Sequence, residues 1–151
     1  MREPLVIAIG NPLRSDDGAG PALAELLRRE GLRVLVVHQL GPELCDEVAA
    51  APVVVFLDAR AGGPAGSVRL TPLTGGAGSA ASTHAVAPEV VLALAERLHG
   101  ARPTAALVTL GAASFELGEG LTPEVARALP SARRVVEQFL APFSKATRAA
   151  R

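Results

Sequence analysis

The sequence predicts a three-layer α/β/α domain on a five-stranded, twisted, mixed sheet that is mostly parallel, with its fourth strand antiparallel. Three runs of aliphatic residues, at 5–9, 33–38 and 53–57, alternate with segments of helical pattern. Continuous apolar runs are typical of strands covered on both faces, and strands that alternate with helices form parallel sheets. A chain of 151 residues is expected to form one domain, over residues 1–151.

The pattern changes after residue 58. Residues 67–72 alternate polar and apolar side chains, and only a short glycine-rich stretch connects them to the third strand. A parallel neighbour needs a crossover of about a dozen residues or more. We therefore expect an antiparallel, half-exposed edge strand here, followed later by a fifth buried strand at 105–110.

The connecting segments complete the expected domain. Residues 74–83 are small and polar, which predicts a mobile loop that delivers His84 to a helix over 88–98. Pro130 should break or kink the last helix. The tail from about residue 144 to residue 151 is expected to fray.

Composition excludes several classes of partner. Basic and acidic residues both number 15, and there are four Phe but no Trp or Tyr, so nothing indicates nucleic-acid binding. No apolar stretch has membrane-spanning length, and the first residues read as a strand rather than a signal peptide. A lone Cys45 excludes an internal disulfide and is expected to be a buried structural thiol. We expect a soluble, cytoplasmic monomer.

Familiar motifs for phosphate binding fail on spacing and charge. Gly18-Ala19-Gly20 is followed by leucine where a dinucleotide-binding motif needs a small residue. Asp16 and Asp17 would also repel a pyrophosphate. A P-loop is excluded because the only lysine is Lys145, and a serine-hydrolase elbow is absent.

Two aspartates and a histidine are predicted to meet at one edge of the sheet. Asp17 follows the first strand, Asp58 ends the third, and His84 comes from the loop that can reach them. The carboxyl ends of parallel strands converge, and this oxygen and nitrogen ligand set suits nickel, zinc or manganese. His38 is a weaker candidate on the same edge, whereas His99 is expected to complement a helix C-terminus.

The same residues also have ordinary structural interpretations. Asp16 or Asp17 can cap the following helix. Asp58 can accept hydrogen bonds from turn amides, and His84 can be a cap or a surface histidine. From the residues alone, these alternatives stay open.

The stretch IGNPLRSDDGAGPALAELL closely resembles the signature of the hydrogenase maturation endopeptidases, which process the large subunit of nickel–iron hydrogenases. The resemblance continues in the family's order through VVVFLDA, GSVRLTPL, STHAVAPEVVLALAERL and VTLGAASFELGEGLTPEVARAL. It covers nearly the whole chain.

The resemblance implies a function and a set of site residues. Asp17, Asp58 and His84 would be the metal-contacting and catalytic residues, while Asn11 and Asp16 would support the turn or the substrate. The chain would be an aspartic-type endopeptidase that removes a C-terminal peptide from a nickel–iron hydrogenase large-subunit precursor after nickel insertion. The precursor would present the nickel, which zinc or cadmium could replace in a crystal.

Several alternatives remain under this resemblance. The metal could polarise the scissile carbonyl or activate a water; or Asp17 or Asp58 could be the general base, with nickel only a docking check. A nickel-dependent binding module without protease activity and an unrelated small metallohydrolase are the other candidate functions. The chain departs from the family at Arg60, where an apolar residue is usual, and at residues 38–41.

Overall fold

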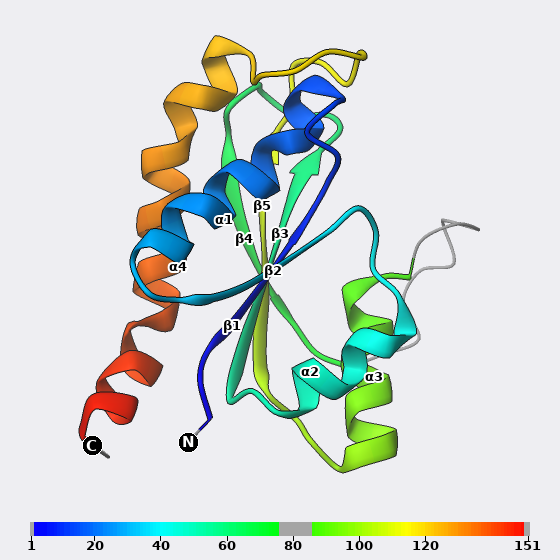
Figure 1. Ribbon diagram of the computed structural model, residues 1–151, viewed down its shortest axis with the longest axis vertical. Coiled ribbons are helices and arrows are strands. Elements are labelled where there is room, and N and C mark those ends of the chain that lie inside the picture. Colours follow the sequence, from blue (N-terminus) through cyan, green and yellow to red (C-terminus); the bar gives the residue numbers. More distant parts are fainter. Residues whose placement is uncertain (1, 76–85, 150–151) are drawn as a thin grey trace.

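The computed structural model describes residues 2–75 and 86–149, and shows one five-stranded sheet between two layers of helices (Figure 1). The strand order is β2-β1-β3-β5-β4. Four strands are parallel, and β4 is antiparallel to β5, as predicted from the short connection before it. The strands are β1 (Leu5–Ile9), β2 (Arg33–Val37), β3 (Val53–Arg60), β4 (Val68–Leu73) and β5 (Thr104–Gly111).

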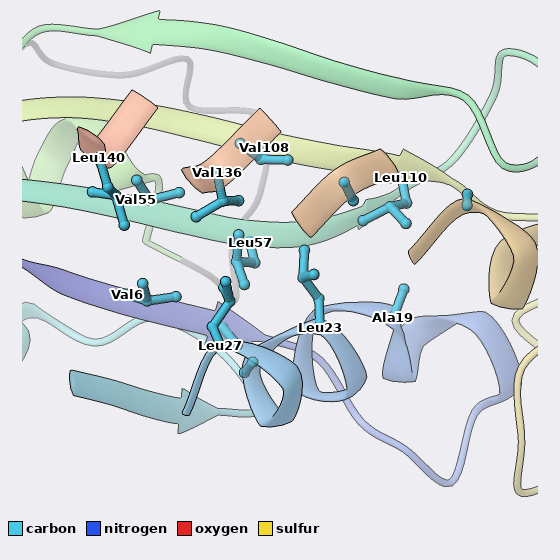
Figure 2. Packing of buried hydrophobic residues seen from close by; sticks show 14 of the residues in the cluster. Val6, Ala19, Leu23, Leu27, Val55, Leu57, Val108, Leu110, Val136 and Leu140 are labelled. Carbon is cyan, nitrogen blue, oxygen red and sulfur yellow. The ribbon is translucent and has the colours of Figure 1, made fainter. Parts of the chain in front are cut away.

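Helices cover both faces of this sheet. Strand side chains alternate between the two faces, so Val55 and Leu57 pack with one group of helices and Val54 and Phe56 with the other. Figure 2 shows the first of these cores, which α1 and α4 cover. The elements are α1 (Ala19–Arg29) and α4 (Pro123–Ala149) on that face, α2 (Cys45–Ala49) and α3 (Pro88–His99) on the other, and two 3-10 turns, η1 (Ser15–Gly18) and η2 (Pro42–Leu44).

The two edge strands differ in how well the sequence predicted them. The first four residues of β4 alternate between half-buried and exposed, and none of its residues is fully buried, as expected of an edge. β2 was predicted to be covered on both faces, and this is wrong: it pairs only with β1 and leaves Val36 41% exposed. Its continuous apolar pattern is that of a central strand, but the topology places it at the end of the sheet.

The last helix is longer than its prolines suggested. Pro130 was expected to break or kink it, yet α4 runs unbroken from Pro123 to Ala149 with Pro130 and Pro142 inside. Its buried face, which includes Val136 and Leu140, packs on the sheet core and offsets the lost backbone bonds. The helix is assigned as far as Ala149, and the expected fraying of the tail from about residue 144 to residue 151 stays a prediction. The helices of the described residues lack the combination of length and hydrophobicity that a membrane span requires.

Candidate active site

The turn after β1 folds back so that Asp17 lies beside the end of the strand. Gly10 has φ +149°, and a Cβ at this position would lie 1.9 Å from the Asp17 carbonyl oxygen. The backbone N–H of Asn11 donates to Asp17 Oδ2 at 2.7 Å. Neither η1 nor α1 has a side-chain cap hydrogen bond, so Asp17 does not cap a helix. Its carboxylate instead closes the turn.

Close packing of α1 brings this turn to the neighbouring strand β3. A Cβ on Gly20 would lie 2.8 Å from the Ile9 carbonyl oxygen and 3.0 Å from that of Leu57. Only glycine lets the start of the helix rest this closely on the ends of both strands. Asp17 is therefore held at the carboxyl edge where β1 and β3 run side by side.

Asp58 lies in β3 on the face toward α2 and α3, close enough to Asp17 to feel its negative charge. The N–H of Ala59 donates to Asp58 Oδ1 at 2.8 Å. Burial raises the pKa of Asp58 to about 7; the Ala59 hydrogen bond opposes this shift, and the negative charge of Asp17 adds to it. The effect of the Asp17 charge on this pKa indicates that the two carboxylates lie near each other. That they belong to one ligand set stays a prediction.

Within the described ranges, neither carboxylate has a basic side chain at ion-pair distance. Among the described residues, Asp17 Oδ1 and Asp58 Oδ2 also accept no hydrogen bond. Two neighbouring carboxylates without a counter-ion are stabilised by a cation, and their hard oxygens suit a divalent metal. His84, the predicted third ligand, lies outside the described residues. His38 is exposed after β2.

Asp16 has a structural role that its sequence position did not reveal. It is fully buried and accepts hydrogen bonds from the backbone N–H groups of Ala113 (2.8 Å), Ser114 (3.1 Å) and Thr122 (2.8 Å), and from the Thr122 hydroxyl (2.8 Å). Burial alone would raise the pKa of Asp16, but these hydrogen bonds outweigh it and lower the pKa. Asp16 therefore ties the Asp17 turn to the segment between β5 and α4.

A second set of hydrogen bonds joins the Asp17 turn to the segment between β5 and α4. Ser15 has φ +50°, an uncommon conformation for a residue other than glycine. Its N–H donates to the Gly118 carbonyl at 2.9 Å, and its hydroxyl donates to the Glu116 carbonyl at 2.8 Å. Gly118 N–H in turn donates to the Leu13 carbonyl at 2.9 Å. The strained turn is thus held from outside by a loop about 100 residues away, which lies beside it in Figure 1.

Comparison with solved structures decides the fold family. No family model matches the chain, and no curated protein matches it. The HybD hydrogenase maturation protease from Thermococcus kodakarensis is 23% identical with a TM-score of 0.69, over 92% of this chain and 99% of that one. HybD from E. coli gives 24% and 0.71 over 94% and 93%, and HycI from T. kodakarensis KOD1 gives 25% and 0.69 over 91% and 89%. The chain has the hydrogenase maturation protease fold.

Within this maturation protease fold, Arg60 at the end of β3 forms hydrogen bonds to β5 and to the segment before β4. Its guanidinium donates to the Thr109 hydroxyl of β5 at 2.6 Å and to the Ser67 hydroxyl before β4. Burial lowers the pKa of Arg60, and the nearby charge of Arg69 lowers it further. Arg60 has no ion pair with Asp58. In the sequence, Arg60 is noticeable only as a single arginine at the end of an apolar strand. Its partners, Thr109 and Ser67, could be identified only from the structure.

Proposed function

We propose that this chain is an endopeptidase that removes the C-terminal peptide of a nickel–iron hydrogenase large-subunit precursor and recognises nickel presented by that precursor. The observation that carries this proposal is the neighbouring pair of Asp17 and Asp58, neither of which forms an ion pair among the described residues. The similarity in fold to HybD and HycI supports the reaction class and the substrate.

The two carboxylates have complementary tasks in this proposal. The Asn11 N–H holds Oδ2 of Asp17, and the Ala59 N–H holds Oδ1 of Asp58. In this proposal, the other oxygen of each carboxylate faces the precursor. His84 supplies an imidazole nitrogen to the same ligand set. The nickel ion of the precursor provides Lewis acidity at the scissile carbonyl. One carboxylate accepts a proton from the attacking water and returns it to the amine nitrogen that leaves.

The direct test is processing of a nickel-loaded precursor by variants of the proposed ligands. Asp17→Asn and His84→Ala should fold but shorten the precursor at least about 100-fold more slowly, because each loses a group that positions the reacting atoms. A gel that separates the precursor from the mature subunit measures this rate. His99→Gln, which changes an exposed histidine outside the proposed ligand set, is the matched control and should process normally.

The other outcomes of this test separate the alternatives. Wild-type rates for both variants would contradict the site assignment. Efficient cleavage of a nickel-free precursor would contradict nickel recognition. Binding without shortening would favour a checkpoint module, and cleavage of unrelated peptides with added metal would favour a general metallopeptidase.

An exposed pair of leucines beside the site offers a surface for the precursor. Leu117 is 84% exposed and Leu13 is 55% exposed, and the Gly118–Leu13 hydrogen bond holds their two loops together. Leu117→Ser should raise KM for the precursor roughly tenfold with little change in kcat, because it removes apolar contact area. Leu98→Ser, at a 64% exposed position on α3, is the control. Equal changes in KM for Leu117→Ser and Leu98→Ser would show that the Leu13 and Leu117 surface does not bind the precursor specifically.

A further inference from the structure

A second group of metal-ligating side chains lies between α2 and α3. Cys45 and Asp46 begin α2, and His99 ends α3. One potential ligand atom from each lies within 4.8 Å of the others. Asp46 and His99 line a pocket of about 360 Å³, to which Arg2 also contributes. Arg2, which lines this pocket, precedes β1. In Figure 1 the start of β1 lies at the opposite end of that strand from the Asp17 turn.

Two donors converge on one oxygen of Asp46. His99 Nε2 lies 2.7 Å from Asp46 Oδ1, and the Cys45 thiol approaches the same oxygen at 3.7 Å. From its sequence position, His99 was expected to complement the C-terminus of its own helix. In the structure it also pairs with Asp46 of α2. Cys45 is buried, as predicted, while Asp46 and His99 are exposed and accessible to an ion from solvent.

The positions of these donors are set by packed elements. Val48 of α2 is buried in the same core as Val91 and Ala95 of α3. Gly100, with φ +67°, ends α3 in a left-handed cap whose N–H bonds the Glu96 carbonyl at 2.8 Å. The cap places His99 in the last turn of the helix, directly opposite the start of α2. The site is therefore largely preformed.

We propose that Cys45, Asp46 and His99 bind a divalent transition-metal ion of borderline softness, such as zinc, cobalt or nickel. Thiolate, imidazole and carboxylate are the donors that such ions accept together, and three protein ligands with an adjacent pocket leave a fourth position for water. On binding, the Cys45 S–H bond breaks, a sulfur–metal bond forms, and the proton passes to solvent. The ion would replace the imidazole and thiol hydrogens through which His99 and Cys45 now contact Asp46 Oδ1.

Titration with Co²⁺ tests this site without interference from the candidate active site. A thiolate bound to cobalt gives a charge-transfer absorption in the near ultraviolet. Cys45 is the only cysteine in the sequence, and the Asp17, Asp58 and His84 set contains no sulfur. Reduced wild-type protein should develop the band with one cobalt per chain, Cys45→Ser should abolish it, and Asp17→Asn should retain it.

Exposed ligands give variants that should fold even if Cys45→Ser does not. His99→Gln and Asp46→Asn should each weaken cobalt binding at least about tenfold, with a melting temperature near that of the wild type. Absence of the band at saturating cobalt would overturn the proposal. An unchanged affinity in His99→Gln, or two chains per cobalt, would also overturn it. Because precursor processing is measured separately, failure here is distinct from failure of the proposed protease function.

Discussion

Replacing Asp58 by asparagine should raise the melting temperature of the metal-free protein at about pH 8 and at the same time abolish precursor processing. Burial and the charge of Asp17 make the ionised form of Asp58 unfavourable in the folded state. Asparagine has nearly the same shape, and its Oδ1 can still accept the Ala59 hydrogen bond. The substitution therefore removes the unfavourable charge but also the ligand oxygen that the proposed reaction needs.

The pH dependence of this effect follows from the direction of the shift. The folded-state pKa of Asp58 is about 7, against an ordinary value of 3.8, so the folded protein binds the proton more tightly. The contribution of Asp58 to the stability of the wild type should fall as pH rises between these two values, and the destabilisation from this group should be complete above the higher one. The advantage of Asp58→Asn should be on the order of 2 kcal/mol at about pH 8, or roughly 4–8 °C, and should vanish near pH 4.

Thermal melts in the presence of a chelator measure this difference. Glu3→Gln, which neutralises an exposed carboxylate, should leave the melting temperature nearly unchanged at both pH values. A variant that is equally stabilised at both pH values, or destabilised at the higher one, would contradict the account. Agreement would show that the candidate site stores unfavourable electrostatic energy, as sites that bind cations do.

Much of the fold could be predicted because local patterns matched the topology. The connection after residue 58 is too short for a parallel crossover, and this alone set the direction of β4. The order of the βαβ units also led to the prediction that Asp17 and Asp58 lie at one edge of the sheet. The exposure of β2 could not be predicted, because its residues match those of a central strand and only the final strand order makes it an edge.

The side-chain contacts that shape the two candidate sites join residues far apart in the sequence. Asp16 meets partners 97 to 106 positions away, and Asp46 meets His99 at a separation of 53. No spacing motif records such pairs, because loops of unrelated length separate them. Helix capping was a reasonable hypothesis for Asp16, but burial of the turn against the segment before α4 determines its role.

Replacing Asp16 by alanine should therefore be among the most destabilising substitutions of a polar residue in this protein. Its carboxylate is the hydrogen-bond acceptor for the N–H groups of Ala113, Ser114 and Thr122, and for the Thr122 hydroxyl. Alanine leaves these donors unpaired in a buried place, at a cost of about 3–5 kcal/mol. Urea unfolding at neutral pH measures the loss.

Asp16→Asn separates the role of charge from that of shape. Oδ2 accepts from three donors and Oδ1 from one, so an asparagine that keeps its oxygen at the Oδ2 position turns its NH₂ group toward the Thr122 N–H. We expect an intermediate loss of about 2–3 kcal/mol. Because the folded-state pKa of Asp16 is lowered, its stabilising effect is present above the ordinary value of 3.8 and is lost as pH falls through the lower folded value. Losses equal to those of Leu98→Ser would show that Asp16 does not hold the two segments together, and the Asp17 turn would then need another support.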